Sequence, residues 1–502
     1  MDLATALGWA AQRHPDRRAV GGAGRHLTYR QWDARTNQLA RALTAVGVRP
    51  GDRVALSLAG GEPLASLHLA AQKLGAVSVP LSTRFGPDEL GYCLGDAAAA
   101  LLVTDATTAE RAAGVAGEIP VRDVGELDAR GADEPDGALS EVPAEDTMSV
   151  ILYTSGTTGR PKGVPRTHRA EHTAAVAHAV QTQQRQGEVV LGVMPMFHTM
   201  GLRTLLASII VGGTWVGQPD YDPAGSLELM RAENVTSLFL VPTIYWSLLH
   251  SGRLGEARTL DRLAYAGAAM TPTLAEQLVD TVAPTAFVNH FGSTEIYTFT
   301  IGPDVAAKPG SAGRAGIFSQ VRLVSPEPGA PPDALVGPGE QGQVIVSMAS
   351  PEAFGGYWQR PDADEKVIRD GWYYTGDLAT TDDDGDLWVA GRVDDMINSG
   401  GENIYPDEIE AALVRCAAVA DVCVVGLPDE RWGHAVTAFV VPARGTDPAA
   451  AVSAIAAHAR SVLPSLKRPK RVIAVEAIPR SGVGKTLRRT LVAGEFEALA
   501  DA

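Results

Sequence analysis

The chain has 502 residues, of which 45% are hydrophobic and 20% are charged, and its formal net charge at pH 7 is −16. This length predicts more than one domain, because single hydrophobic cores stop growing near about 250–300 residues. An acidic surface repels nucleic acids and anionic membranes, which argues against both as partners.

Cysteine usage and the N-terminus favour a cytoplasmic protein. The sequence has three cysteines and no C-x-x-C motif, which argues against a disulfide framework and a zinc ribbon. Its first residues lack the basic and apolar pattern of a signal peptide. The apolar stretch at residues 205–213 is far shorter than the ~20 residues that a membrane span needs, so no membrane span is expected.

Short β-branched runs alternate with Ala- and Leu-rich helical patterns in the first part of the chain. Strands are predicted at residues 53–58, 76–81 and 101–104, with a helix at 63–74. This alternation is typical of doubly wound parallel sheets. The polar residues from about 114 to 145 are expected to form a surface connection before the next strand.

The second part of the chain has a different pattern. Two Pro/Gly-rich patches, 326–332 and 337–342, flank a predicted β-rich subdomain that runs to about residue 390. After it come a predicted strand at 422–426, a helix at 448–460 and a strand at 471–475. We therefore predict an α/β protein with a large N-terminal domain of doubly wound sheets (1–393) and a small α+β C-terminal domain (394–502).

A polar, glycine-rich segment follows the apolar residues 150–152. The glycines expose backbone N–H groups, hydroxyl side chains add donors and a lysine adds positive charge, so the segment is predicted to bind a triphosphate. A Walker motif does not fit here, and an ordinary surface loop is the alternative. The residues assigned to the nucleotide are Thr154, Ser155, Gly156, Thr157, Thr158, Gly159 and Lys162.

The order S-G-T-T-G-x-P-K-G in this segment resembles the phosphate loop of the AMP-forming adenylate-forming enzymes. This superfamily includes acyl-CoA synthetases, carrier-protein adenylation domains and luciferases. The resemblance covers essentially the whole chain, and the latter part looks most similar to benzoate-type aryl-CoA ligases of the halobenzoate kind. It implies ATP, Mg²⁺ and coenzyme A (CoA), and a mobile C-terminal domain.

Several residues are similar to those that line the acyl pocket in this family. They are His198, Thr199, Gly267, Ala268, His290, Gly292, Tyr297 and Thr298. His198 is also implied to act where the pocket meets the thiol tunnel. Positions 290, 297 and 298 are more apolar in halobenzoate ligases. The resemblance therefore implies the same reaction for this chain, but not a halobenzoate substrate. A hydroxylated aromatic acid, another bulky ring-bearing acid or a medium-chain acid stays open.

The stretch Phe291-Gly292-Ser293-Thr294-Glu295 resembles the aromatic-G-x-T-E motif of the family. By this resemblance Phe291 would stack on adenine, with Gly292 and Ser293 beside the nucleotide. Thr294 and Glu295 would hold phosphate and Mg²⁺, and one glutamate suffices because Mg²⁺ keeps several waters. The alternative is a helix-capping turn.

Further motifs follow in the second part of the chain. Asp377, in a Y-x-T-G-D pattern, is implied to accept hydrogen bonds from the ribose hydroxyls with help from Arg392; a plain turn is the alternative. Asp394 is implied to be the hinge of domain rotation. Gly400 and Gly401 would let the backbone approach the pantetheine arm.

The CoA nucleotide is implied to meet Trp432, Arg468 and Lys470, and Leu466 replaces an aromatic residue of the relatives. Lys485, in a glycine loop near the C-terminus, resembles the catalytic lysine of the family. Preorganised positive charge where negative charge moves is worth roughly 3–4 kcal/mol. His168, Glu171 and His172 match the zinc pattern H-x-x-E-H, but no third ligand is apparent.

The sequence therefore predicts an AMP-forming carboxylic acid:CoA ligase that makes an acyl-adenylate and then a thioester. Three alternatives stay open. The chain could load a carrier protein, perform mainly thioesterification of an acyl-AMP from a partner adenylating enzyme, or bind nucleotide without catalysis. A homodimer also stays open.

Overall fold

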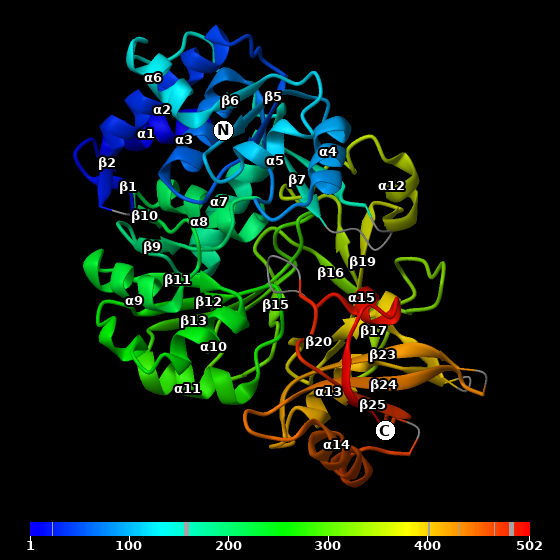
Figure 1. Cartoon of the computed structure of the whole chain (residues 1–502). Helices are drawn as coiled ribbons and strands as arrows, with labels where there is room; N and C mark the ends of the chain where they lie inside the picture. The colour runs from blue at the N-terminus through cyan, green and yellow to red at the C-terminus, as the bar shows by residue number, and fades with distance from the viewer. Residues whose placement is uncertain are drawn as a thin grey trace. The chain divides into compact units, whose positions relative to one another are not determined.

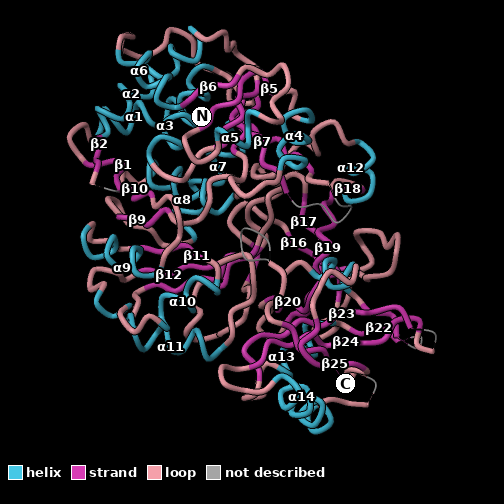
Figure 2. Tube along the Cα trace, in the orientation of Figure 1, coloured by secondary structure: helices cyan, strands magenta, loops and turns pink. Residues whose placement is uncertain are grey.

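The computed structural model describes residues 1–22, 24–154, 160–399, 402–429, 431–465, 467–480 and 486–501 (Figures 1 and 2). The chain divides into two compact units. The first contains Met1–Val321 and Val346–Tyr373, and the second contains Arg322–Ile345 and Tyr374–Ala502. The predicted boundary at 393/394 lies inside the second unit, and rotation about Asp394 stays a prediction.

Two large sheets organise the first unit. The described strands of one sheet lie in the order β15 (Arg314–Ala315), β14 (Thr300–Gly302), β13 (Ala286–Phe291), β12 (Arg262–Tyr265), β11 (Ser237–Leu240), β9 (Val189–Gly192), β10 (Thr214–Gly217), β1 (Arg18–Gly22) and β2 (Arg25–Thr28). Those of the other lie in the order β6 (Val121–Asp123), β5 (Ala99–Thr104), β3 (Arg53–Ser57), β4 (Val77–Pro80), β7 (Met148–Thr154) and β8 (Lys162–Thr167). The central strands pair in parallel, as β3 does with β4 and β5. The predicted α/β fold class is confirmed.

Helices precede the first strand of this unit and connect the strands that follow. They are α1 (Leu3–Arg13), α2 (Tyr29–Ala45), α3 (Glu62–Leu74), α4 (Pro87–Asp96), α5 (Ala109–Ala113), α6 (Val124–Ala132), α7 (His168–Gln181), α8 (Thr199–Ile210), α9 (Pro223–Ala232), α10 (Pro242–His250), η1 (Leu254–Glu256), α11 (Pro272–Val282) and α12 (Pro361–Val367). α3 shows what sets the bounds of such a helix. Proline stands in its first turn, and Gly75 ends the helix in a left-handed conformation with a φ of 77°. α7 and α8 pack against each other and carry residues of the site (Figure 1).

The segment 114–145 is more structured than a surface connection. β6 adds a parallel strand beside β5, and α6 follows it. Asp123 caps α6 by accepting a hydrogen bond from the Gly125 amide, and Leu127 is fully buried in the core. A strand of three residues and a helix of nine are too short to give a clear hydrophobic period, which is why the sequence pattern missed them.

The predicted β-rich subdomain is confirmed as a sheet. It contains β16 (Val321–Val324), β17 (Gly342–Ser347), β18 (Ile368–Arg369), β19 (Trp372–Thr381) and β20 (Leu387–Arg392). The C-terminal part adds η2 (Val393–Asp395), β21 (Ile397–Ser399), β22 (Glu402–Ile404), α13 (Pro406–Leu413), β23 (Val419–Asp429), β24 (Gly433–Pro442), α14 (Pro448–Val462), β25 (Arg471–Val475), α15 (Arg488–Val492) and β26 (Ala498–Asp501). The predicted elements at 422–426, 448–460 and 471–475 are thus confirmed as β23, α14 and β25. None of the helices among the described residues is long and apolar enough to cross a bilayer.

Candidate active site

The predicted phosphate loop connects the antiparallel strands β7 and β8. Thr154 and Lys162 are paired across the ladder, and the Thr154 hydroxyl donates to the Lys162 carbonyl at 3.5 Å. The hairpin therefore holds the two ends of the loop together. Ser155, Gly156, Thr157, Thr158 and Gly159 lie outside the described residues, so their contact with phosphate stays a prediction.

Tyr357 links this loop to the predicted Mg²⁺ ligand. The Lys162 Nζ atom lies 4.1 Å from the centroid of the Tyr357 ring, and the Tyr357 hydroxyl donates to Glu295 Oε1 at 2.7 Å. Burial and then the nearby Glu295 carboxylate raise the pKa of Tyr357, so the hydroxyl stays a donor. Sequence reasoning missed Tyr357, because no charge or motif marks it.

The residues 291–295 form a tight turn after β13. The Ser293 hydroxyl accepts from the amides of Glu295 at 3.1 Å and Ile296 at 3.3 Å. A Cβ atom at Gly292 would lie 1.8 Å from the Tyr297 carbonyl oxygen, so only glycine permits this approach. Phe291 is half-buried and packs edge-on against Phe299 at 5.1 Å. These contacts fix the turn, and its contact with nucleotide stays a prediction.

The donor set at this turn suits Mg²⁺. Glu295 offers one carboxylate, 7% of its surface is exposed, and Thr294 beside it offers a hydroxyl. Mg²⁺ in nucleotide sites takes one or two carboxylates, phosphate oxygens and waters, which fits this set. A bound Mg²⁺ would supply positive charge that neutralises the phosphates.

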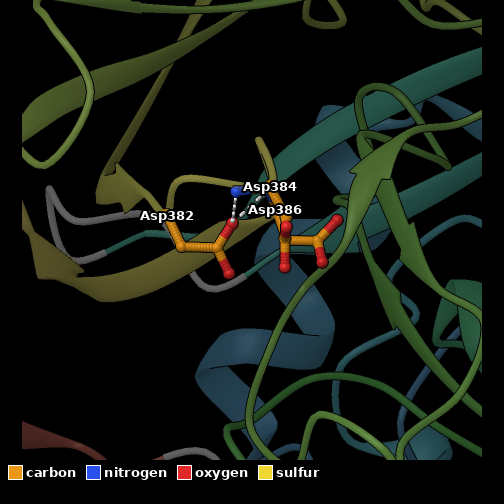
Figure 3. A group of neighbouring side chains, drawn as sticks. All are labelled: Asp382, Asp384 and Asp386. Carbon is orange, nitrogen blue, oxygen red and sulfur yellow. Dashed lines mark hydrogen bonds between the residues drawn. The ribbon is translucent and has the colours of Figure 1, made fainter.

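A second acidic group lies in the turn between β19 and β20. Figure 3 shows Asp382, Asp384 and Asp386; one carboxylate oxygen from each of them lies within 4.8 Å of the others. Asp382 Oδ1 accepts from the amides of Asp384 and Asp386 at 3.0 and 2.9 Å, and its Oδ2 accepts from the Trp388 indole. These bonds show that Asp382 shapes the turn.

A buried ion-pair network lies behind the Thr294–Glu295 turn. Arg166, from β8, donates to the carbonyls of Thr294 at 2.9 Å and Glu295 at 3.2 Å. Its Nε atom also binds Glu171 Oε1 at 2.5 Å. Arg203 pairs with the other oxygen of Glu171 and donates to its carbonyl. All three charged side chains are fully buried, so the carboxylate in the H-x-x-E-H pattern is a partner of two arginines.

Three of the predicted acyl residues lie together in the interior. The His290 and Tyr297 rings are 4.4 Å apart, and His290 Nε2 lies 3.2 Å from Thr298 Oγ1. The amide and hydroxyl of Thr298 donate to Glu352 Oε2 at 3.1 and 2.9 Å. Burial raises the pKa of Glu352, and Arg166 is among the groups that oppose this rise. Glu352 was not predicted, because a buried glutamate leaves no local pattern.

Two further side chains that the sequence did not single out complete this cluster. His178 Nδ1 lies 2.8 Å from the Tyr297 hydroxyl. The His178 and Phe239 rings pack edge-on with their centroids 4.7 Å apart, and the ring centroids of Phe239 and His290 are 5.9 Å apart. Both residues read as ordinary core positions of a helix and a strand, so only their side-chain contacts identify them.

The other predicted acyl residues lie near the start of α8. His198 caps this helix, with its Nδ1 accepting from the Met200 amide at 3.3 Å, and Thr199 is buried. Gly267 has a φ of 82°, and a Cβ there would lie 3.7 Å from Met200 Sδ. Gly267 and the first turn of α8 are therefore neighbours, and Ala268 is exposed. A cavity of about 350 Å³ elsewhere in this unit is lined by residues such as Leu74, Val142 and Trp358, none of them predicted for the acid.

In the second unit, the predicted ribose residues form an ion pair. Arg392 Nη1 lies 2.7 Å from Asp377 Oδ1, and Arg392 Nη2 donates to the Thr375 carbonyl at 3.2 Å. The pairing of β19 with β20 places the two residues opposite each other. Asp394 is exposed in η2, and Gly400 and Gly401 lie outside the described residues.

The structure brings together two of the three residues that were predicted to meet the nucleotide part of CoA. Lys470 Nζ lies 4.9 Å from the Trp432 ring centroid. Arg468 is used differently, because its Nε and Nη2 atoms donate to the carbonyls of Leu463 and Arg460 at the end of α14. These bonds cap the helix and leave a role at the CoA phosphates as a prediction.

Lys485 lies outside the described residues, so its catalytic role stays a prediction. The loop that carries it begins after Arg480 and ends before Thr486, which are bridged by a 3.2 Å hydrogen bond. Just beyond the loop, Arg488 pairs with Asp395 at 3.3 Å and with Asp407 at 2.5 Å. The segment after Lys485 is thereby tied to the residue next to the predicted hinge.

Known proteins agree with this architecture. Residues 7–358 match the AMP-binding enzyme family, and residues 408–485 match the AMP-binding enzyme C-terminal domain. Feruloyl-CoA synthase of Amycolatopsis sp is 38% identical over 485 residues, covering 95% of this chain and 96% of the relative. 4-chlorobenzoate–CoA ligase of Arthrobacter sp is 32% identical, with coverages of 97% and 94%. The structure of o-succinylbenzoate CoA synthetase from Bacillus subtilis, in complex with its acyl-adenylate intermediate, has a TM-score of 0.85 and 27% identity, covering 97% of each chain.

The chain therefore belongs to the AMP-binding enzyme family. It is an AMP-forming acid–CoA ligase that uses ATP, CoA and Mg²⁺, as the sequence motifs predicted.

Proposed function

We propose that this ligase activates an aromatic acid, and that the cluster of His178, Phe239, His290 and Tyr297 contacts its ring. The main supporting observation is that the ring centroids of His290 and Tyr297 lie 4.4 Å apart. This arrangement puts aromatic rings beside polar atoms at positions that were predicted to contact the acid. Aromatic side chains prefer to pack against other rings. Relatives named for feruloyl, 4-chlorobenzoate and 2-succinylbenzoate CoA thioesters support the same substrate class.

We assign roles to the nucleotide residues on the same basis. The loop from Thr154 to Lys162 holds the triphosphate, and Thr294 and Glu295 hold phosphate and Mg²⁺. Asp377 and Arg392 bind the ribose, and their 2.7 Å ion pair supports this by orienting the carboxylate. Phosphate chemistry of this kind needs positioning and charge neutralisation rather than a protein nucleophile.

The thiol acceptor is proposed to be CoA itself. The contact of Lys470 with the Trp432 ring supports this, because a cation beside an aromatic face suits a nucleotide with phosphates. A carrier-protein thiol is the alternative acceptor of the acyl group. A separate proposal is that the protein forms a homodimer. We also place the protein in the cytoplasm, since the described Cys93, Cys416 and Cys423 are free thiols.

The deciding experiment measures acid-dependent pyrophosphate release from ATP, with and without CoA. The panel contains cinnamic and benzoic acids with and without ring substituents, cyclic acids and medium-chain acids. Release with aromatic acids and formation of their CoA thioesters would support the proposal. Turnover restricted to medium-chain acids would contradict it. Silence across the panel, with thioester formed from synthetic acyl-AMP, would assign the chain to the second half-reaction.

A further inference from the structure

The imidazole of His178 has a nitrogen atom without a hydrogen-bond partner among the described residues. His178 is fully buried in α7. Its Nδ1 lies 2.8 Å from the Tyr297 hydroxyl, whereas its Nε2 is a buried atom without a partner. A buried polar atom without a hydrogen-bond partner is unfavourable, so this unpaired nitrogen calls for an explanation.

The surroundings of His178 distinguish it from other buried histidines. The centroid of its ring lies 4.7 Å from the ring centroid of Phe239, 6.0 Å from that of Tyr297 and 6.4 Å from that of His290. Two of these neighbours are predicted to contact the acid. His168 begins the same helix, is equally buried and also has unpartnered nitrogens, but it has no described contact with these rings. The position of His178, and not the unpaired atom alone, therefore points to the substrate.

The chemistry of a neutral imidazole selects one kind of ligand group. Burial lowers the pKa of His178 to about 3, and the pKa of His290 is lowered to about 3 as well, so neither ring is charged at neutral pH. A neutral imidazole has one donor and one acceptor nitrogen, and the bond to Tyr297 decides which of them is Nε2. A hydroxyl group can donate or accept, so it matches either tautomer.

We propose that His178 Nε2 binds a hydroxyl group on the ring of the acid and makes this ligase select hydroxylated over unsubstituted aromatic acids. This inference rests on the proposed function. A site built to hydrogen-bond a hydroxyl strongly rejects an analogue without it, because the protein group is then left buried and unpaired. His178 is thus a residue that determines specificity.

The test compares kcat/KM for cinnamic acid with that for its 3-hydroxy and 4-hydroxy derivatives. Wild-type enzyme is expected to prefer one hydroxylated acid by at least about 100-fold. His178→Phe is expected to lower that preference at least about tenfold. The value for unsubstituted cinnamic acid should fall less than the value for the hydroxylated acid, because phenylalanine removes the polar nitrogen but still fills an apolar site. His168→Phe is the matched control and should leave the preference unchanged.

Other outcomes would overturn the inference. They are the absence of a hydroxyl preference in the wild-type enzyme, an equal loss for both acids in His178→Phe, and an unchanged preference. If His178→Phe does not fold, His178→Asn serves as the second variant, since its short side chain cannot place a polar atom where Nε2 lies. Retention of the wild-type preference in that variant contradicts the role. If no aromatic acid is turned over, the proposed function itself fails; if the acids react and the ratio does not move, only this inference fails.

Discussion

The Tyr357 hydroxyl donates a 2.7 Å hydrogen bond to Glu295 Oε1, so the proposed Mg²⁺ ligand is held by an uncharged side chain. The Glu295 carbonyl is held as well, because it accepts from the Phe354 amide at 2.8 Å. The same tyrosine ring lies 4.1 Å from the ammonium group of Lys162. One side chain therefore contacts two charged groups that are proposed to act on the same triphosphate.

We expect Tyr357→Phe to weaken adenylation. The change leaves the ring in place but removes the hydrogen bond to Glu295, and bonds to charged groups are worth about 1.5–3 kcal/mol. This corresponds to roughly a tenfold to 100-fold lower rate of acid-dependent pyrophosphate release. The Mg²⁺ concentration for half-maximal rate should rise, because the carboxylate is no longer held in place. Titration of Mg²⁺ at saturating ATP measures both effects.

Tyr245→Phe is the matched control for this prediction. Tyr245 is fully buried, and its hydroxyl donates to the carbonyls of Leu238 and Ala264 at 3.1 and 2.9 Å. Its replacement should lower stability and leave the Mg²⁺ dependence unchanged. Equal shifts of the Mg²⁺ midpoint in both variants would show that Tyr357 acts only through stability.

Glu171→Ala is expected to lower the free energy of unfolding by about 3–5 kcal/mol. Removing this carboxylate leaves Arg166 and Arg203 buried without their ion-pair partner, and uncompensated buried charge is costly. Because Arg166 also holds the Thr294 and Glu295 carbonyls, pyrophosphate release should fall more than thioester formation from supplied acyl-AMP. Urea unfolding and the two half-reaction assays measure these effects.

Asp146→Asn provides a surface comparison, because its partner Arg169 lies on α7, the helix that also carries Glu171. Asp146 binds Arg169 through two hydrogen bonds of 2.7 and 3.0 Å, but both side chains are exposed. Exposed ion pairs contribute little, so the unfolding midpoint should hardly change. A large effect there and none at Glu171 would contradict the assignment of stability to the buried network.

Local motifs were readable from the sequence, and contacts between distant segments were not. The Thr294–Glu295 turn is contiguous, and Asp377 and Arg392 stand on neighbouring strands 15 residues apart. In contrast, Tyr357 is 62 residues from Glu295 and His178 is 119 residues from Tyr297. Only tertiary packing brings such pairs together, and no periodic pattern of one segment encodes it.

Arg468 shows a different limit of the sequence. A basic run within the small C-terminal domain indicates anion binding, but the sequence does not say which donors already have partners. Two donors of Arg468 are occupied by the carbonyls of Leu463 and Arg460, which end α14. The structure thus gives this arginine a capping role in addition to the contact with CoA that the sequence predicts.

We predict that Trp432→Ala raises KM for CoA without changing pyrophosphate release in the absence of CoA. The ring is proposed to pack on the nucleotide part of CoA, and stacking on a base is worth roughly 1–3 kcal/mol. KM for CoA should therefore rise about fivefold to 100-fold. Trp246→Ala, which removes a tryptophan stacked on His250 in α10, is the control and should leave KM for CoA unchanged. An equal rise in both variants would contradict the assignment.

Stability is predicted to fall in mild acid because several histidines, among them His68, His178 and His290, are buried in the neutral form. Burial lowers the pKa values of His68, His178 and His290 to about 3, whereas an unfolded histidine titrates near about 6.5. Between these values the unfolded chain binds more protons, so stability rises with pH through this window and is lost as the pH falls below about 6.5. These three histidines alone should make the free energy of unfolding about 4 kcal/mol lower at pH 5.5 than at pH 8.

His178→Phe gives this pH prediction a direct control. The variant lacks one titrating group, so the loss of stability between pH 8 and pH 5.5 should shrink by about 1.4 kcal/mol. Urea unfolding at both pH values, for variant and wild type, measures the difference. An unchanged loss would mean that His178 is protonated to the same degree in the folded and unfolded chains. That result would also contradict the neutral imidazole on which its proposed bond to a substrate hydroxyl depends.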